Sequence, residues 1–312
     1  MIEKKNYFAA AQILAGGGGG GGSATTLYGV KNDRLFSYDL DTDTEDFNLV
    51  TTTSANVFMD ADSTNLFTAT FADIEVEKFD LTGSNIWTNT DHTSFVRGVI
   101  VDASGNVYSC ASDNTVRKMN SAGVNQWTNT DHADEVFAVA IDDAGDVIST
   151  GLDSTVRKIN SGTGVQTWSY ALGNRGIAVC CDDSGNSFAC GVDNNNVTKI
   201  DSSGSFVWNF TTSSNYARAL TCDNDGNLYT AGRGQRVHKV DTSGSEVWNY
   251  NVGADCYSVA VDLNNFVYVG DSLGDITVLD DSGTFVKTIT TSGSGVVNSL
   301  VTNDLRVPVF RP

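Results

Sequence analysis

Short apolar stretches alternate with short polar, glycine-containing stretches along most of this chain. In one such unit, residues 135–142 (EVFAVAID) are apolar on both faces, as expected of a strand that lies between two neighbouring sheets. The stretches DVIST and TVRKIN follow, with the turn GLDS between them, and the last stretch, VQTWSY, carries a tryptophan. The pattern predicts four short strands joined by tight turns.

The tryptophan of this unit recurs at a fixed period. One period before the first copy lies Phe47, and one period after the last copy lies Lys287, so the chain holds seven units. Seven units of about 40 residues, each with four antiparallel strands, are typical of a β-propeller. The sequence therefore predicts an all-β, seven-bladed β-propeller of four-stranded antiparallel blades. The intervals are 40, 41, 40 and 40 residues, between Trp87, Trp127, Trp168, Trp208 and Trp248.

Two turn patterns accompany the repeat. An Asp-x-x-Gly turn follows the first strand of a unit, as in DDAGD at 142–146, and an Asp- or Asn-x-x-Gly turn follows the third. In both, the side chain of Asp or Asn caps the turn and glycine takes the positive φ. The run DNDGN at 223–227 also resembles a calcium loop. If Gly226 is aligned to the invariant glycine of an EF-hand loop, the twelfth position of that loop falls on Gly232, where a bidentate glutamate is required. We therefore interpret the run as one more turn.

The two ends of the repeat region complete each other. Residues 26–30 (TLYGV) align with second strands, whereas residues 295–303 (GVVNSLVTN) align with first strands and lack a continuation. We therefore predict that the C-terminal strand is the innermost strand of the first blade and closes the ring. On this interpretation the propeller spans residues 24–303, and residues 304–312 form a short tail.

The N-terminal segment differs from the repeat. Apolar residues at helical spacing predict a short amphipathic helix over residues 1–15. Residues 16–23, with the sequence GGGGGGGS, predict a flexible tether. We expect the helix to anchor the chain to a larger assembly. A signal peptide is the alternative, because lysines precede the apolar segment, although Glu3, Asn6 and Gln12 interrupt it. The expected anchor residues are Tyr7, Phe8, Ile13 and Leu14.

Charge and cysteine usage narrow the possible partners. With 38 acidic and 19 basic residues, the net charge of -19 argues against a nucleic-acid or anionic-membrane partner. No apolar run approaches the ~20 residues of a membrane helix. The six cysteines lie in apolar runs without metal-ligand spacing, which predicts buried free thiols and synthesis in a reducing cytoplasm.

Units such as GDVISTGLDSTVRKINSGTGVQTW and GNLYTAGRGQRVHKVDTSGSEVW resemble the quinoprotein-like (PQQ-like) propeller repeat. The resemblance covers residues 24–303. It implies the fold, in which the periodic tryptophan docks each blade onto the next. It leaves the activity open, since the same repeat serves dehydrogenases, assembly scaffolds and surface proteins. In the dehydrogenases an adjacent cysteine pair packs against the cofactor. Here Cys180 and Cys181 lie in an innermost strand, where successive side chains point to opposite faces, so we predict a packing role and no cofactor.

The motif WTNTDH occurs twice, and each copy ends at the loop that leads to the next blade. Unit duplication accounts for the copies. The loops should emerge on one face of the propeller, one blade apart, so we predict that Asp91, His92, Asp131 and His132 form a partner-contact patch rather than a metal site.

Basic residues at repeated positions suggest two further sites. Arg97 and Arg218 occupy equivalent places in innermost strands, so we expect them to reach the central channel, where they could hold a small anion. Lysine recurs in the third strand of five units. These lysines could form a basic ring, or their stems could cover apolar blade surface while the ammonium groups meet acidic turns. We favour the second interpretation for Lys78, Lys118, Lys158, Lys199 and Lys239.

No catalytic motif is evident. None of the three histidines lies in a recognisable Ser-His-Asp, Cys-His or HExxH arrangement, and His238 in RVHKV should face solvent. We therefore predict a non-enzymatic structural or adhesion propeller without metal or cofactor. Its N-terminal peptide (1–23) would attach it to a virion surface or tail, where it could bind a host-surface receptor or glycan. The alternatives are an exported, periplasmic or secreted PQQ-like scaffold for protein assembly, and a propeller lyase or quinoprotein.

Overall fold

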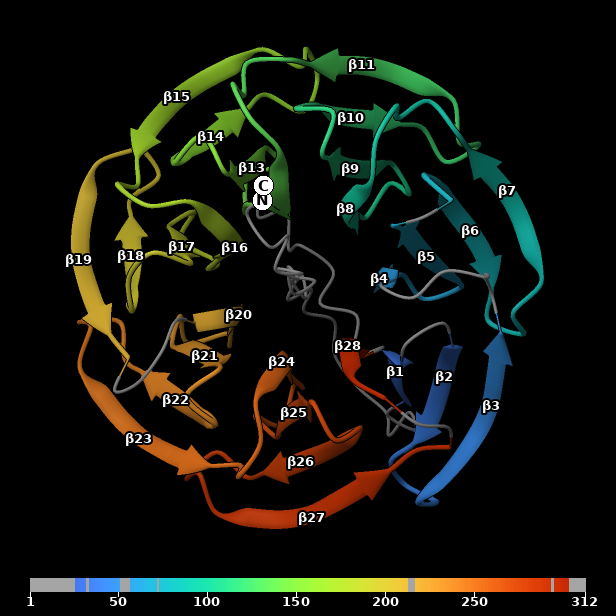
Figure 1. Cartoon of the computed structure of the whole chain (residues 1–312), viewed down its shortest axis with the longest axis vertical. Coiled ribbons are helices and arrows are strands. Elements are labelled where there is room, and N and C mark those ends of the chain that lie inside the picture. Colours follow the sequence, from blue (N-terminus) through green and yellow to red (C-terminus); the bar gives the residue numbers. More distant parts are fainter. Residues whose placement is uncertain are drawn as a thin grey trace, which may run out of the picture.

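The structure, a computed structural model, describes residues 26–31, 34–50, 57–71, 73–212, 217–292 and 295–302. The predicted anchor helix (1–15, with Tyr7, Phe8, Ile13 and Leu14), the tether (16–23) and the tail (304–312) lie outside the described residues. The described residues contain strands and turns only, and their strands form seven four-stranded antiparallel sheets arranged as a ring (Figure 1). The predicted seven-bladed β-propeller is confirmed.

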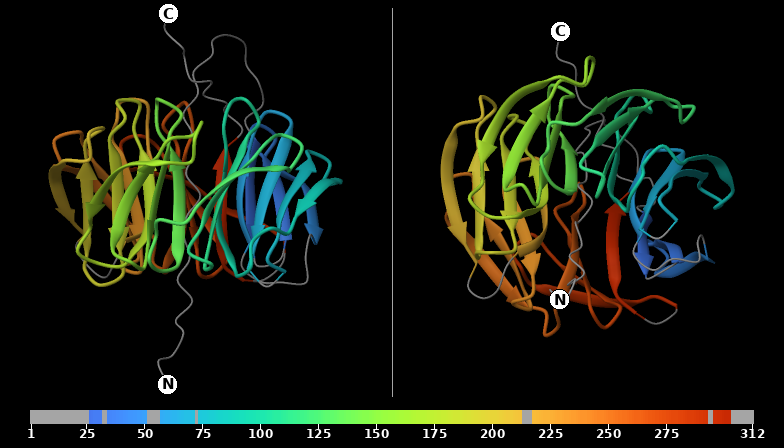
Figure 2. Two further views of the ribbon diagram at one scale, coloured as in Figure 1. Left: turned by 90° about the horizontal axis from the view of Figure 1, so that it is seen from above. Right: turned by 45° about the horizontal axis from the view of Figure 1, so that its top comes forward.

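The blades follow one another along the chain, and each runs from an innermost to an outermost strand (Figures 1 and 2). Blade 1 consists of β28 (Val297–Thr302), β1 (Thr26–Lys31), β2 (Arg34–Asp39) and β3 (Thr44–Val50). Blade 2 consists of β4 (Val57–Ala61), β5 (Asn65–Thr70), β6 (Val76–Asp80) and β7 (Asn85–Asn89). Blade 3 consists of β8 (Val96–Val101), β9 (Val107–Ala111), β10 (Val116–Met119) and β11 (Asn125–Asn129). Blade 4 consists of β12 (Val136–Ile141), β13 (Val147–Gly151), β14 (Thr155–Ile159) and β15 (Gln166–Ala171).

The remaining three blades have the same order. Blade 5 consists of β16 (Gly176–Cys181), β17 (Ser187–Gly191), β18 (Asn196–Ile200) and β19 (Phe206–Thr211). Blade 6 consists of β20 (Ala217–Cys222), β21 (Leu228–Gly232), β22 (Arg236–Val240) and β23 (Glu246–Asn251). Blade 7 consists of β24 (Cys256–Val261), β25 (Val267–Asp271), β26 (Asp275–Leu279) and β27 (Phe285–Thr290).

The C-terminal strand closes the ring as predicted. β28 pairs antiparallel with β1, and its Leu300 and Val301 lie opposite Gly29 and Tyr28. Blade 1 therefore joins the two ends of the propeller sequence in one sheet. Gly29 is required at this position, because a Cβ atom there would lie 2.2 Å from the ring of Phe36 and 2.9 Å from Leu300.

Burial differs sharply between inner and outer strands. β8, β12, β16 and β20 are buried at every residue, whereas β15 alternates between half-buried and exposed residues. An inner strand has a neighbouring blade on each side, so it reads as a continuous apolar run. The hydrophobic core consequently lies between the blades, around the inner strands.

A β-bulge near the start of the inner strand recurs in blades 3 to 7. In β8 the register shifts between Val96 and Gly98, so Arg97 is the additional residue. A bulge redirects the side chain of its extra residue. The same place is held by Phe137, Ile177, Arg218 and Tyr257 in the four following blades.

Each periodic tryptophan lies on the turn between the third and fourth strands of the next blade. The indole Nε1 of Trp87 donates a hydrogen bond to the carbonyl of Ser121 at 3.1 Å. A Cβ atom on Gly123 would be 2.8 Å from the indole ring, so the contact requires glycine. Equivalent contacts join Trp127 to Gly164, Trp168 to Gly204, Trp208 to Gly244 and Trp248 to Gly283.

Replacing Gly123 with alanine is expected to lower the free energy of unfolding by about 3 kcal/mol, because its backbone has a positive φ and its Cβ atom would displace the Trp87 ring. Gly145 is a matched control, since both glycines have a φ of 79° and nothing lies within 4 Å of a Cβ atom on Gly145. Gly145→Ala should cost about 1 kcal/mol. Urea denaturation measures both losses, and equal losses would contradict a docking role for this contact.

Candidate functional site

The two repeated histidines lie in equivalent loops that enter blades 3 and 4. His92 lies between β7 and β8, and His132 lies between β11 and β12. Both imidazole rings are buried, whereas the preceding Asp91 and Asp131 are exposed. The histidine side chains therefore cannot form the surface contacts that we expected of them. Partner contact by these loops stays a prediction, and it now depends on the exposed aspartates.

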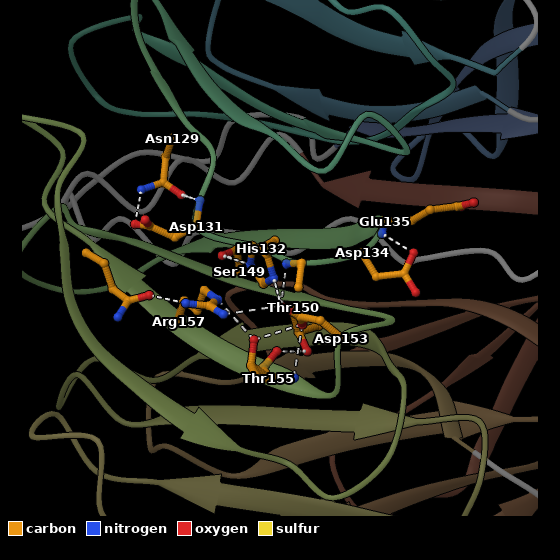
Figure 3. Close-up of polar contacts among 12 residues, drawn as sticks. Asn129, Asp131, His132, Asp134, Glu135, Ser149, Thr150, Asp153, Thr155 and Arg157 are labelled. Carbon is orange, nitrogen blue, oxygen red and sulfur yellow. Dashed lines mark hydrogen bonds and ion pairs between the residues drawn. The ribbon is translucent and has the colours of Figure 1, made fainter.

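Each imidazole is held between a carboxylate and a hydroxyl group, and Figure 3 shows this for His132. His132 Nδ1 lies 3.0 Å from Asp153 Oδ2, and His132 Nε2 lies 2.8 Å from Ser149 Oγ. Because a carboxylate only accepts hydrogen bonds, Nδ1 donates to Asp153, and in the neutral imidazole Nε2 accepts from Ser149. Ser149 belongs to β13, and Asp153 belongs to the turn between β13 and β14. The network thus fastens an inter-blade loop to the middle of the following sheet.

Blade 3 contains the same network with the same distances. His92 Nδ1 lies 3.0 Å from Asp113 Oδ2, and His92 Nε2 lies 2.8 Å from Ser109 Oγ. This Ser-His-Asp geometry corrects the sequence-based statement that no such arrangement is present. The sequence did contain a signal, because Ser and Asp follow His at the same separations in both copies, as His92, Ser109 and Asp113, and as His132, Ser149 and Asp153.

The position of the serine decides what this geometry can do. In a hydrolase the Ser Oγ atom of such a triad must reach the scissile bond of the substrate. Ser109 and Ser149 are both 0% exposed, inside the sheet and beneath the loop. The hydroxyl groups therefore have no path to a substrate in this structure, and the arrangement acts as a buried polar clamp between blades.

Electrostatics also favour a structural role for the clamp. Burial alone would raise the pKa of Asp153, but hydrogen bonds from His132, Thr155 and the amide of Ala133 together hold that pKa well below its ordinary range. The pKa of Asp113 is lowered in the same way. Arg157 adds a further contact, with Nη2 3.3 Å from Asp153 Oδ2. Both carboxylates are therefore charged and fully engaged within the protein.

A second interaction fixes the exposed part of the loop. Asn129 Nδ2 donates to Asp131 Oδ2 at 2.7 Å and to the carbonyl of Gly164 at 3.0 Å, in the turn of the next blade (Figure 3). Asn89 makes equivalent bonds to Asp91 and Gly123. The exposed carboxylates of Asp91 and Asp131 are thus presented in a fixed orientation.

The two predicted channel arginines lie apart. Arg97 belongs to β8, which packs on β4 and β12, whereas Arg218 belongs to β20, which packs on β16 and β24. Blades 4 and 5 lie between them, so the structure does not bring them together around one anion. Both are buried, and each guanidinium lies over the bulge residue of the next blade: Arg97 is 4.4 Å from the Phe137 ring centroid, and Arg218 is 4.0 Å from that of Tyr257.

Arg97 is also engaged by polar groups. Its Nη2 atom lies 2.9 Å from Glu135 Oε2, and its Nε atom donates to Ser112 Oγ at 2.8 Å. The ring of Phe71 lies on it as well, with its centroid 4.7 Å from the guanidinium carbon. Arg97 therefore connects three successive blades, and this account replaces the expectation of an anion site.

The repeated lysines follow the interpretation that we favoured. Lys158 Nζ lies 2.6 Å from Asp142 in the turn of its own blade, and Lys199 Nζ lies 3.4 Å from Asp182. Lys239 contacts the carboxylates of Asp223 and Asp281. Aromatic rings lie beneath the ammonium groups of Lys78, Lys118, Lys199 and Lys239 at 4.9–5.4 Å. Carboxylates thus neutralise Lys158, Lys199 and Lys239, whereas Lys118 donates to the carbonyl of Ser161.

The prediction that His238 faces solvent is wrong. Its side chain is buried, its Nδ1 atom lies 2.7 Å from Glu246 Oε2, and its ring packs edge-on against Phe210 of the preceding blade. Third strands lie inside the blade, so a neighbouring blade covers each of their faces. Among the strand residues whose burial is described, exposed side chains occur only in the fourth strands of the blades.

The cysteines pack as predicted. All six are free and buried, and burial raises the pKa of each thiol for which a shift is resolved, including those of Cys180 and Cys181. Cys180 and Cys181 belong to different hydrophobic clusters, as expected of neighbours on one strand that point to opposite faces. Within the described ranges, no group of three or more His, Cys, Asp or Glu side chains could hold a metal ion.

Comparison with known proteins identifies the repeat independently. The family model described as outer membrane protein assembly factor BamB matches residues 42–179 and 193–286. No curated protein matches the sequence. In the part of the chain that the structure describes, no helix is long and apolar enough to span a membrane.

Proposed function

Because this chain belongs to the BamB family of PQQ-like propellers, we propose that it is a non-enzymatic scaffold that binds other polypeptides. Two features support the absence of catalysis. The hydroxyl groups of the Ser-His-Asp clamps are buried, and so are the six thiols. The family name further favours export and a role in assembling outer-membrane proteins, which agrees with the periplasmic alternative from the sequence. The virion or tail role depends on residues 1–23, outside the described residues, and stays a prediction.

One observation carries this proposal: exposed apolar side chains recur at the start of the outer strands. Outer strands all run the same way around the ring (Figure 1), so their starts lie on one rim of the propeller. We call these side chains the apolar belt. Scattered apolar residues are ordinary on a protein surface, but these recur at one rim in successive blades, which supports an interaction surface there. The belt consists of Ile86, Val124, Val165, Phe206, Val207, Val247, Phe285 and Val286, which are 44–62% exposed.

The backbone beside the belt suits a polypeptide partner. Each outer strand pairs with only one other strand of its sheet, so its second edge has backbone N–H and C=O groups available to an added strand. Belt side chains would supply apolar contacts next to that edge. With a net charge of -19, the propeller would favour partners that are neutral or basic where they meet it.

The proposal predicts that a partner cross-links from the belt and depends on it. A photo-reactive amino acid at Val165 or Val247 should capture a polypeptide, whereas the same group at Leu273 should not. Leu273 is the matched control, because it is 72% exposed and lies in the turn between β25 and β26, at the opposite rim. With the captured partner purified, Val165→Glu/Val247→Glu should weaken binding at least about tenfold. Leu273→Glu should leave binding unchanged, and equal effects at both rims would contradict the proposal.

A further inference from the structure

The junction between blades 7 and 1 is built differently from the five junctions that contain tryptophan. Lys287 in β27 lies opposite Val278 of β26, just as Trp248 in β23 lies opposite Lys239 of β22. Lys287 therefore occupies the tryptophan position of its blade. A lysine side chain is thinner than an indole, so it fills less of the space between two blades.

The turn that faces Lys287 also differs from the turns that face a tryptophan at the other junctions. Asp39 to Thr44 form a six-residue connection like Asn160 to Val165 in blade 4, so Asp43 corresponds to Gly164, the glycine beneath Trp127. Both residues have a positive φ, 59° at Asp43 and 72° at Gly164. Lys287 Nζ is hydrogen-bonded to the Asp43 carboxylate. An ion pair between exposed side chains thus replaces the contact of indole with glycine.

A cavity of about 310 Å³ lies at this junction. Its walls correspond to the surroundings of the indole in other blades. Tyr268 takes the place of Tyr229, whose ring centroid is 6.0 Å from that of Trp248. Leu40 takes the place of Ser161, whose carbonyl accepts the indole N–H of Trp127. On the side of blade 7, the cavity is further lined by Phe266, Val278, Val286 and Lys287, and by the polar residues Asp262 and Asn264. The fold therefore forms a tryptophan slot here without supplying the tryptophan.

We propose that this slot binds a tryptophan side chain that a partner polypeptide presents beside a basic residue. The inference deepens the scaffold function and rests on it. The slot opens onto the apolar belt at Val286, and its volume lies at the lower end of the range for ligand pockets. Asp41 lines it and is exposed, so the rim attracts a cationic neighbour of the tryptophan. Tryptophan is also a frequent anchor in protein interfaces.

Fluorine NMR can test this directly. The probe is the peptide acetyl-Lys-(5-fluoro-Trp)-Lys-amide, whose single fluorine reports only on the indole. Titration with the wild-type protein should shift and broaden the fluorine signal, with a dissociation constant between about 10 µM and 1 mM, as expected for one anchoring side chain. A probe in which the lysines are replaced by glutamates should bind at least about tenfold more weakly, because the rim is acidic.

Two double variants separate filling of the slot from loss of its charges. Lys287→Trp/Asp43→Gly installs the pair found at the other junctions and should fill the slot with the protein's own indole, so affinity should fall at least about tenfold. Lys287→Ala/Asp43→Gly removes the same charges but leaves the slot open, and affinity should stay within about threefold. Thermal unfolding of both variants checks that the ring is intact.

Three outcomes would overturn the proposal: no fluorine shift with the wild-type protein, equal shifts with the wild-type and filled variants, or loss of binding in the open variant. Equal binding of the lysine and glutamate probes would overturn the assignment of a basic neighbour. Cross-linking from Val165 and Val247 is independent of the slot. If it succeeds while the probe fails, the scaffold function stands and the tryptophan slot does not.

Discussion

Replacing His132 with alanine should lower the free energy of unfolding by about 3 kcal/mol, because the change leaves buried polar groups without their partner. His132 joins the carboxylate of Asp153 to the hydroxyl of Ser149, and all three side chains are almost completely buried. Ser149→Ala removes the smaller polar group and should cost about 1 kcal/mol. Urea denaturation at neutral pH measures both losses.

Acid should weaken the same clamp. The pKa of Asp153 is lowered in the folded protein, so its contribution to stability is fully present above the ordinary carboxyl pKa of about 4 and is lost as the pH falls below it. His132→Ala removes one cause of the lowered pKa, so the variant should lose less stability than the wild type on acidification. An assay of ester hydrolysis tests the alternative that the Ser-His-Asp group is catalytic. If Ser149→Ala abolished a hydrolytic activity without changing stability, the serine would be a nucleophile rather than a structural group.

Replacing Asp60 with asparagine should stabilise the protein above pH 7 by up to about 4 kcal/mol. Asp60 lies in β4, is buried, and accepts a hydrogen bond from the amide of Val101 in the next blade at 2.8 Å. Burial raises the pKa of this carboxyl group to about 7. The charged form is therefore penalised in the folded state, and the wild type loses stability as the pH rises from about 4 to about 7. Asparagine keeps the acceptor oxygen and carries no charge.

Unfolding of wild type and Asp60→Asn at pH 5 and pH 8 checks this prediction. The difference between the two proteins should be several-fold larger at pH 8 than at pH 5. Glu77 provides an internal comparison, because burial raises the pKa of its carboxyl group to about 7 as well, and it remains in the variant. An equal difference between the two proteins at pH 5 and pH 8 would show that Asp60 is already matched by its surroundings.

The sequence predicted the architecture because its signals are local and repeated. A strand covered on both faces must be a continuous apolar run, as in residues 135–142, and the tryptophan period of about 40 residues counts the blades. Ring closure followed from the same alignment, since residues 26–30 lacked a first strand and residues 295–303 lacked a second. Each of these inferences depended only on order along the chain.

The sites were harder to predict because they depend on what the neighbouring blade covers. His132 follows an exposed aspartate in a polar loop, yet its ring turns inward to Ser149 and Asp153 of the next sheet. His238 was assigned to a solvent face because its strand was treated as an outer one. The side chain of Arg97 was expected to reach the central channel, but Glu135 and three aromatic rings surround it. In each case the deciding partner lies in another strand or another blade.

Ring closure through β28 has a consequence for synthesis. A nascent chain that has not reached residue 297 holds the strands of six complete blades, while blade 1 lacks its innermost strand and β1 has an unpaired edge. Unpaired edges recruit strands from other molecules. Blade 1 of such an open ring could be completed by β28 of a second chain in place of its own.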